Sequence, residues 1–320
     1  MKEIKKSKII ELIRHLEKKY DVFLPVQKGD NWVFGKLSYD VGIMNLKPVL
    51  TVLPPKKYLN ADGEQVYSSK EGEIYYSENN TKPLALFGVN SFDINALKLL
   101  DQIMNRPVSE PNYLKKRKNM IVVGVGPERI NLASSGYDIF LEEYENEYLA
   151  IAGTPAGSEI LEWKIFDNSK KKPKKILSFN DPVLSQSDKI KKAIEKSYGA
   201  KIWQDLAKTC LGCGICAYVC PLCYCNEFED SFEHTSEVSN SRCKSCRRKR
   251  WDACFLPDFF QVAGHNNREN LSDRIYNWYH HKFVRMPEEY GHMGCVDCGR
   301  CIEFCPAKIN FKKVLKELIK

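Results

Sequence analysis

The first 209 residues of the chain contain no cysteine, although the whole sequence of 320 residues has thirteen. All thirteen lie between Cys210 and Cys305. The sequence therefore divides into a thiol-free part and a thiol-rich part. Any chemistry that depends on thiols must belong to the second part.

Long apolar runs are also missing. No stretch approaches the roughly 18 uninterrupted apolar residues of a membrane-spanning helix. Near the start, Glu11, Arg14 and Glu17 occupy positions where a secretory signal would be apolar. We therefore expect a cytoplasmic protein without a membrane span. In a reducing compartment thiols rarely form structural disulfides, so the cysteines are expected to serve metal or redox chemistry.

Sequence patterns typical of catalytic sites are few as well. The segment "VVGVGPER" places Gly124 and Gly126 after an apolar run, but Arg129 stands where a dinucleotide-binding turn needs its third glycine. No Ser/His/Asp set or pair of carboxylates stands out, and the adjacent His280 and His281 would point in different directions on a helix. We therefore assign the chain no nicotinamide site and expect no catalysis by the chain alone.

The net charge of +8 is modest for this length. Part of the excess lies in a lysine-rich segment with Pro173, which is typical of a solvated linker, and we assign residues 166–187 to it. A second basic run lies among the cysteines and comprises Arg247, Arg248, Lys249 and Arg250. Such a run could stabilise a reduced, more negative metal cluster, or form a docking surface for an acidic partner.

Periodicity predicts an α+β protein with two domains. Residues 1–165 are predicted to form a mixed α/β domain with a structural and subunit-docking role. It would begin with an amphipathic helix at 9–20, continue with strands that include 47–55, and contain a helix capped by Ser91. Residues 188–320 are predicted to be mostly helical, with amphipathic segments at 271–279 and 311–319.

Two copies of one cysteine motif dominate the second domain. "CLGCGICAYVCP" contains Cys210, Cys213, Cys216 and Cys220, and "CVDCGRCIEFCP" repeats the spacing with Cys295, Cys298, Cys301 and Cys305. Three thiolates on a tight loop can hold three corners of a [4Fe–4S] cluster, whereas the fourth, before proline, binds the other cluster in two-cluster ferredoxins. We therefore predict one cluster on Cys210, Cys213, Cys216 and Cys305, and another on Cys295, Cys298, Cys301 and Cys220.

Several glycines suit this interpretation. Gly212, Gly214, Gly294 and Gly299 would let the loops wrap an inorganic core closely and turn N–H groups toward its sulfurs. Zinc is the alternative metal, but a zinc site uses paired Cys-x-x-Cys units and needs no third cysteine at equal spacing. The pattern favours iron–sulfur chemistry.

Five cysteines remain, namely Cys223, Cys225, Cys243, Cys246 and Cys254. They could provide four thiolates for a third [4Fe–4S] cluster or for zinc, with one to spare or with His234 as a ligand. Alternatively, several of them are small buried side chains that line the first two clusters. The residues leave both interpretations open.

The segments "CLGCGICAYVCPLCYC", "RWDACFLPDFFQVAGHNNR" and "YHHKFVRMPEEYGHMGCVDCGRCIEFCP" resemble sulfhydrogenase β subunits and the related A subunits of anaerobic sulfite reductases. Upstream, "PPKKYL", "PLALFGVNSFDINALKLLD" and "MIVVGV" fit the N-terminal domain of the same group. The resemblance covers nearly the whole chain, and the segment with "WDAC" and "AGHN" is its most specific part.

The resemblance implies an electron-transfer subunit of an anaerobic oxidoreductase complex, with an α-helical ferredoxin-like cluster domain. Its expected partners are a flavin-containing subunit linked to NAD(P)H or ferredoxin, and a catalytic subunit that is a nickel–iron hydrogenase or a sirohaem sulfite reductase. Neither nucleic acid nor a membrane is expected as a partner. Relatives often carry further cysteines near 90 and 131–135 that this chain lacks, and Cys243 and Cys246 are additions to the pattern.

Two other functions fit parts of the sequence. A zinc-stapled nucleic-acid-binding protein would explain "CKSCRRKR" and the positive charge, and would bind nucleic acid in a salt-sensitive manner. A stand-alone iron–sulfur reductase would need an open iron site near Cys223 or Cys225.

Overall fold

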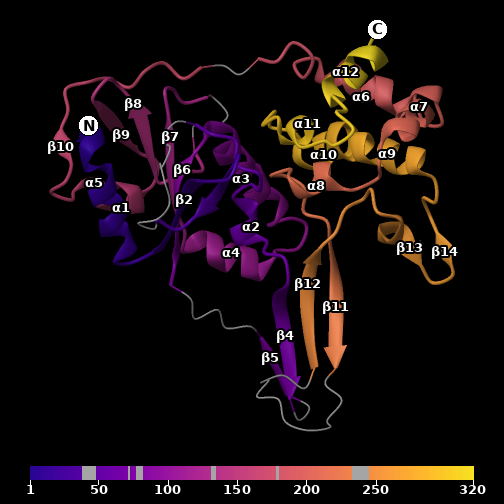
Figure 1. The fold of residues 1–320 in the computed structure, drawn as a ribbon, viewed down its shortest axis with the longest axis horizontal. Helices are drawn as coiled ribbons and strands as arrows, with labels where there is room; N and C mark the ends of the chain where they lie inside the picture. Colours follow the sequence, from indigo (N-terminus) through magenta and orange to yellow (C-terminus); the bar gives the residue numbers. More distant parts are fainter. Residues whose placement is uncertain (38–47, 71–72, 77–81, 131–134, 178–179, 233–244) are drawn as a thin grey trace.

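The computed structural model describes the chain except for residues 38–47, 71–72, 77–81, 131–134, 178–179 and 233–244. A sheet-rich half that begins at the N-terminus lies beside a helical half that contains the C-terminus, and a β-arm projects from the region between them (Figure 1). None of the helices described is both long enough and apolar enough to span a membrane.

The sheet-rich half is built on one mixed sheet with the strand order β10-β1-β9-β8-β7-β6-β2-β3. The neighbours β2, β6, β7 and β8 run parallel, and the remaining pairs are antiparallel. Its strands are β1 (Lys2–Lys5), β2 (Asp21–Lys28), β3 (Asn31–Gly35), β6 (Leu84–Val89), β7 (Ile121–Gly126), β8 (Ile139–Glu143), β9 (Glu147–Ala152) and β10 (Asp167–Asn168). The central strands are buried apolar runs, as expected for a sheet that is covered on both faces.

Alternation along the strands produces two cores. Ala85 and Phe87 of β6 pack with α1 (Ile9–Glu17) and α5 (Pro155–Leu161) on one face. Leu86 points to the other face, where it packs with α3 (Ser91–Ile103) and α4 (Pro111–Lys118). This second core also contains Leu222, Met286 and Val296 of the helical half, so it joins the helical half to the sheet-rich half.

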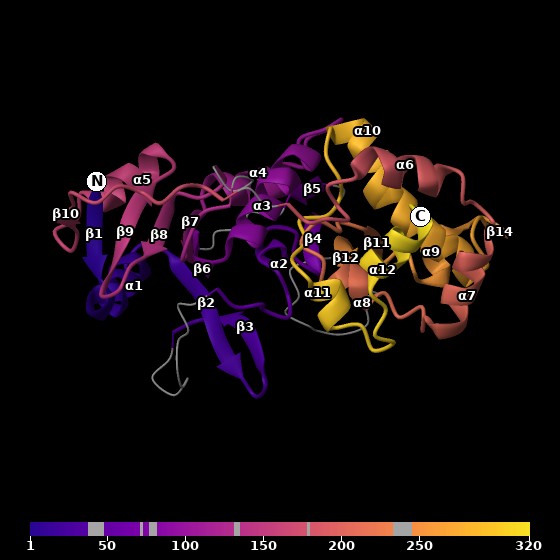
Figure 2. The ribbon, with the colours of Figure 1, turned by 90° about the horizontal axis from the view of Figure 1, so that it is seen from above.

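The helical half surrounds a third core, to which several cysteine side chains belong. Its elements are α6 (Ser187–Glu195), α7 (Lys201–Thr209), α8 (Ile215–Tyr218), α9 (Leu271–His280), the π-helical turn η4 (His281–Arg285), α10 (Met286–Tyr290), α11 (Arg300–Glu303) and α12 (Phe311–Leu318). The 3-10 turn η3 (Pro257–Phe260) precedes a short hairpin of β13 (Gln261–Val262) and β14 (His265–Asn266). In the first half, the 3-10 turn η1 (Lys6–Lys8) precedes α1, and α2 (Lys56–Leu59) lies on the side of the sheet that faces the helical half (Figures 1 and 2).

The β-arm combines strands from both halves in the order β11-β12-β4-β5. The strands β4 (Glu64–Lys70) and β5 (Glu73–Tyr76) come from the first half. The strands β11 (Asn226–Phe232) and β12 (Ser245–Trp251) come from the segment between the two cysteine motifs. Strand β12 pairs with β4 from Ser245 opposite Ser69 to Lys249 opposite Glu64.

The structure confirms the α+β fold class and the first and last amphipathic helices, and it corrects three local expectations. The described residues 48–55 form no strand beyond a single bridge at Thr51, because Pro54 and Pro55 end the apolar run. Helix α3 is capped by Asn90, whose side chain accepts from the N–H of Asp93, and not by Ser91. The segment between the cysteine motifs contains the antiparallel strands β11 and β12, within the part that the sequence predicts to be mostly helical.

Two lysines of the segment 166–187 have partners in the sheet-rich half. Lys171 forms ion pairs with Glu3 and Glu147 at the edge of the sheet. The backbone N–H of Lys174 donates to Glu142 at 2.7 Å. Part of this segment is therefore held against the first half by charge and hydrogen bonds.

Candidate metal centre

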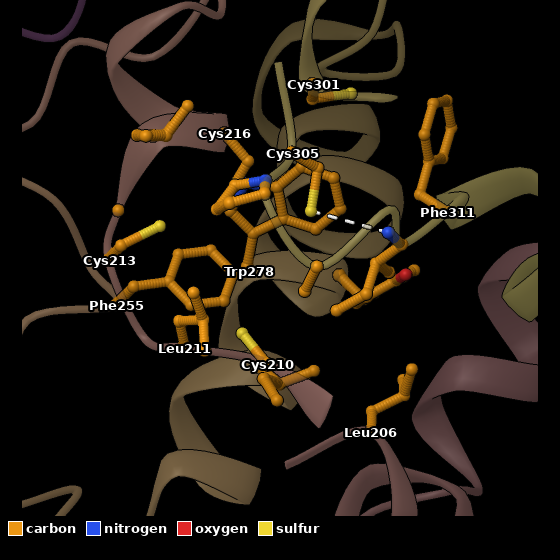
Figure 3. A pocket seen from close by; sticks show the side chains of 17 residues that line it. Leu206, Cys210, Leu211, Cys213, Cys216, Phe255, Trp278, Cys301, Cys305 and Phe311 are labelled. Carbon is orange, nitrogen blue, oxygen red and sulfur yellow. Dashed lines mark hydrogen bonds between the residues drawn. The ribbon is translucent and has the colours of Figure 1, made fainter. Parts of the chain in front are cut away.

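The first hollow of the helical half is lined by cysteines of both motifs. Cys210, Cys213 and Cys216 come from the first motif, and Cys305 comes from the second. In Figure 3 the sulfur atoms of Cys210, Cys213 and Cys305 point into the space between them. The other lining residues include Leu206, Phe255, Trp278, Cys301 and Phe311, and none of the lining side chains is charged. A set of soft thiol ligands in an otherwise apolar wall fits iron–sulfur chemistry.

The second hollow has the reciprocal composition. It is lined by Cys295, Cys298 and Cys301 of the second motif and by Cys220 of the first. Trp278 and Phe311 border both hollows, and so does Cys301. The eight motif cysteines thus gather in two adjacent groups, and the last cysteine of each motif lies with the opposite motif.

The backbone of the two motifs repeats in space. Gly212 and Gly214 have φ values of 63° and 72°, and the equivalent positions Asp297 and Gly299 have values of 57° and 80°. A positive φ is easy for glycine and unfavourable for aspartate. At Asp297 the conformation is accompanied by an ion pair, because Lys312 Nζ lies 2.6 Å from its Oδ1. Three of these four positions are glycines, so the pattern of glycines in the sequence did not predict the positive φ at Asp297.

Backbone N–H groups are directed at four of the sulfurs. The N–H groups of Gly212 and Asp297 donate to the first cysteine of each motif, Cys210 and Cys295, at 3.4 Å. The last cysteines receive the same kind of bond, from Leu222 to Cys220 and from Ile309 to Cys305, again at 3.4 Å. Figure 3 shows the bond to Cys305 as a dashed line. Such donors stabilise negative charge on sulfur.

Burial strongly disfavours free thiolates at most of these positions. Desolvation raises the pKa of Cys295 to about 12 and that of Cys298 to about 11. Desolvation also raises the pKa of Cys216 and Cys301. A coordinating metal deprotonates a thiol outright, so a bound cluster would reverse this cost.

Two buried lysines lie near the second hollow, and sequence reasoning did not identify them. Lys282, from the π-helical turn η4, donates to Cys220 Sγ at 3.2 Å and to the carbonyl of Gly294 at 2.9 Å. Lys56, from α2, donates to the carbonyls of Ala217 and Cys223 at 3.2 Å and 2.6 Å. Lys282 lies inside a segment that carries the family resemblance, but nothing in the spacing of the residues marks either lysine as buried.

A buried ion pair connects this region to the first half. The guanidinium of Arg300, at the start of α11, lies 2.6 Å and 2.7 Å from the two carboxylate oxygens of Asp93. It also donates to the carbonyl of Thr51 at 2.7 Å. Both charged side chains are fully buried. The position of Cys298 and Cys301 on either side of Arg300 is therefore fixed by residues of the sheet-rich half.

The five remaining cysteines do not form one group in the part of the chain described. Cys225 lies against Cys254, whose hydrogen bond lowers the pKa of Cys225 to about 7, and Cys223 lies against Cys220. Cys246 is elsewhere, on strand β12, and is disulfide-bonded. Cys243 and His234 lie outside the described residues. Among the described residues, no group of three or more Cys, His, Asp or Glu side chains is arranged to hold a single metal ion.

The basic run at 247–250 belongs to strand β12 and is largely neutralised by carboxylates of the arm and of the start of α4. Arg247 lies 2.5 Å from Asp230, and Arg250 lies 2.8 Å from Glu229. Lys249 is buried between Glu64 and Glu110, at 3.7 Å and 3.5 Å. These pairings weaken both roles suggested for the run, because three of its cations already have carboxylate partners in the same region.

Comparisons with known proteins agree with this geometry. Residues 209–309 match the family described as a 4Fe-4S dicluster domain. The chain is 31% identical to sulfhydrogenase 2 subunit beta of Pyrococcus furiosus over 331 aligned positions, which cover 96% of this chain and 95% of the relative. No solved structure matches the chain. The chain therefore belongs to the family of sulfhydrogenase β subunits and carries a 4Fe–4S dicluster domain in its thiol-rich half.

Proposed function

We propose that the chain is the iron–sulfur electron-transfer subunit of a sulfhydrogenase-like complex. The dicluster domain supplies the redox function, and the relative is by name one subunit of a sulfhydrogenase. The observation that carries the proposal is the crossing of the two motifs, in which Cys305 lines the first hollow and Cys220 lines the second.

The proposed ligands follow from this crossing. The first centre takes Cys210, Cys213, Cys216 and Cys305, and the second takes Cys295, Cys298, Cys301 and Cys220. When bound, each [4Fe–4S] cluster supplies a one-electron carrier.

The chain's own residues would prepare both sites. The apolar wall with Trp278 and Phe311 limits access of water, and the backbone N–H groups of Gly212, Asp297 and Ile309 stabilise charge on the sulfurs.

Iron and sulfide analysis tests the proposal directly. Protein purified without oxygen is expected to contain about eight irons and eight acid-labile sulfides per chain. The variant Cys305→Ala should lose the electron paramagnetic resonance (EPR) signal of the first centre and keep that of the second, and Cys220→Ala should do the reverse. Cys246→Ser, on strand β12, is the matched control and should retain both signals.

Two outcomes would contradict the proposal. Zinc without sulfide would replace the iron–sulfur interpretation with the zinc-stapled alternative. If Cys305→Ala instead damaged the second centre, each motif would hold its own cluster and the crossing would be wrong.

We further propose that the complex contains two kinds of partner. One is a flavin subunit that exchanges electrons with NAD(P)H or ferredoxin, and the other is a catalytic subunit. The name of the relative favours a hydrogenase over a sirohaem sulfite reductase as the catalytic partner. Purification of the native complex, followed by flavin, nickel and sirohaem analysis, distinguishes the two: nickel is expected and sirohaem is not.

The thiols of Cys223, Cys225 and Cys254 define a narrower proposal for a third centre. Cys223 lies against Cys220, Cys225 lies against Cys254, and Cys254 also interacts with Cys216, whereas Cys246 is in the arm. A third cluster at these thiols predicts about twelve irons per chain and a loss of about four in Cys254→Ala. If these cysteines are instead small side chains lining the first two centres, the iron content stays near eight and is unchanged by this substitution.

A further inference from the structure

We infer that the buried ammonium groups of Lys282 and Lys56 raise the reduction potential of the second centre, so that it is reduced more easily than its thiol ligands alone would allow. This inference rests on the proposed function, because it concerns residues that act on a cluster held by Cys220. It assigns to one residue of the sheet-rich half, Lys56, a direct electrostatic role in electron transfer.

The first observation is the burial of two unneutralised cations. Lys56 and Lys282 are only 3% and 4% exposed. Within the described part of the chain, neither forms an ion pair with a carboxylate, whereas the third buried lysine, Lys249, lies between Glu64 and Glu110. An isolated buried ammonium is costly, so a negative group is expected beside these two lysines.

The second observation is the direction of Lys282. Its Nζ donates to the Sγ of Cys220 at 3.2 Å and to the carbonyl of Gly294, next to Cys295, and it lies 5.3 Å from the centre of the Trp278 ring. A charged donor therefore contacts a proposed ligand of the second centre. Lys282 also lines the second hollow itself.

The third observation places Lys56 on the same side. Its Nζ donates to the carbonyls of Ala217 and Cys223, which flank Cys220 in sequence, and it lies 4.6 Å from the centre of the Trp251 ring. In the part of the chain that the structure describes, the partners of Lys56 are backbone oxygens and an aromatic ring, so its positive charge is not cancelled by them. It adds to the positive potential at Cys220 without contacting a proposed ligand sulfur.

The other charges near the second hollow largely cancel. Arg300 is neutralised by Asp93. Lys312 pairs with both Asp297 and Asp181, at 2.6 Å and 2.8 Å. These three side chains together carry one net negative charge, whereas Lys56 and Lys282 together carry two positive charges.

Near the first hollow, the buried cation Arg274 interacts with Cys210 through space and donates to the carbonyls of Arg268 and Glu269. Among the described residues, no lysine or arginine is hydrogen-bonded to Cys210, Cys213, Cys216 or Cys305. The second centre therefore differs from the first because a charged donor, Lys282, contacts one of its proposed ligand sulfurs.

The buried charges of Lys56 and Lys282 are expected to affect the reduction potentials of the two centres unequally. Reduction adds one negative charge to a cluster, and a buried cation stabilises the reduced form more than the oxidised form. A hydrogen bond from a charged donor adds to this effect. The two lysines therefore raise the potential of the second centre, and the first centre, whose proposed ligands receive no hydrogen bond from either lysine in the described part of the chain, is affected less.

Redox titration monitored by EPR tests the inference. At the wild-type midpoint of the second centre, Lys282→Met is expected to lower the ratio of reduced to oxidised cluster by about tenfold or more. Lys282→Arg should restore most of the ratio, because it retains charge and donors, and Lys282→Gln should lie between. The first centre should change little in each variant.

Lys56→Met is an independent test in the same redox titration, since Lys56 contacts none of the proposed ligand sulfurs. It should shift the second centre in the same direction by a smaller amount. Lys208→Met is the matched control: Lys208 is an exposed lysine on α7, its side chain is 74% accessible, and it precedes Cys210. This control should leave both centres unchanged.

The inference is overturned if iron-loaded Lys282 variants and Lys56→Met all titrate like the wild type. It is also overturned if the first centre shifts as much as the second. Failure of the proposed function would look different, because the wild-type protein would then contain no iron or sulfide to titrate. If Lys282→Met loses its iron, Lys282→Gln and Lys56→Met decide the question.

Discussion

Arg300 shows how a single residue connects the two halves of the molecule. It stands between Cys298 and Cys301 in sequence, yet its guanidinium is bound by Asp93 and Thr51 of the sheet-rich half. Asp93 in turn receives a hydrogen bond from Asn90 at 3.0 Å. A fully buried ion pair is costly to break on one side, because the remaining charge has no solvent to stabilise it.

Substitution of Asp93 tests this connection. Asp93→Asn removes the charge and retains the shape, and we expect the free energy of unfolding to fall by about 3 kcal/mol or more. Urea denaturation of oxygen-free protein, followed by tryptophan fluorescence, measures the change. Asp205→Asn is the control because Asp205 pairs with Lys201 and Lys208 at the surface, where the effect should stay within about 1 kcal/mol.

A double substitution separates charge from packing. Asp93→Leu combined with Arg300→Met removes both charges, and it should recover part of the stability that either single change loses. If the double variant were no more stable than the worse single variant, the shape of this contact would matter more than its charge.

At the scale of elements, the sequence was most informative where a chemical constraint fixes the spacing. The two cysteine motifs placed their residues in two adjacent hollows, and the amphipathic periodicity identified α1 and α12. The grouping needed no knowledge of the fold, because the exchange of the last cysteine follows from cluster geometry.

Other elements could not be recognised locally. Strand β12 reads as a basic run, and its strand conformation depends on pairing with β11 and with β4, which is far away in sequence. The buried positions of Lys56 and Lys282 likewise follow from tertiary packing, since lysine is normally a surface residue.

The motif loops allow a matched test at this scale. Gly214 and Gly299 occupy equivalent positions with φ of 72° and 80°. A Cβ at Gly214 would lie 2.7 Å from the Cβ of Ala253, whereas a Cβ at Gly299 would meet nothing within 4 Å. Both alanine variants carry the backbone strain of a left-handed conformation, about 1–2 kcal/mol, and only Gly214→Ala adds a clash.

We therefore expect Gly214→Ala to be the more destabilising of the two and to lower the occupancy of the first centre. Urea denaturation and iron analysis of both variants measure the difference. Equal losses in the two variants would mean that the strain of the backbone dominates and that Ala253 yields easily.

At the scale of the whole molecule, contacts join the predicted segments 1–165 and 188–320 at several places. The boundaries of these segments, and of the segment 166–187 between them, remain a prediction. The core that contains α3 also includes Leu222, Met286 and Val296. In the arm, β4 from the first half pairs with β12 from the second. Lys56 donates to carbonyls around Cys220, and Asp93 neutralises Arg300 beside Cys298.

A fragment experiment tests this dependence. Residues 188–320 contain all thirteen cysteines, so a self-sufficient cluster domain would assemble both centres alone. We expect the isolated fragment to bind substantially less iron than the full chain and to unfold at lower urea concentration. Its Arg300 would be buried without Asp93, and β12 would lose its pairing with β4.

Coexpression of residues 1–187 as a separate chain provides the control. If the two halves associate, iron content and the urea midpoint should return toward those of the full chain, because the lost contacts are non-covalent. A fragment 188–320 that alone held the full iron content, with the same potentials as the intact chain, would show that the sheet-rich half does not support the centres. It would also remove Lys56 from the set of residues that tune the second centre.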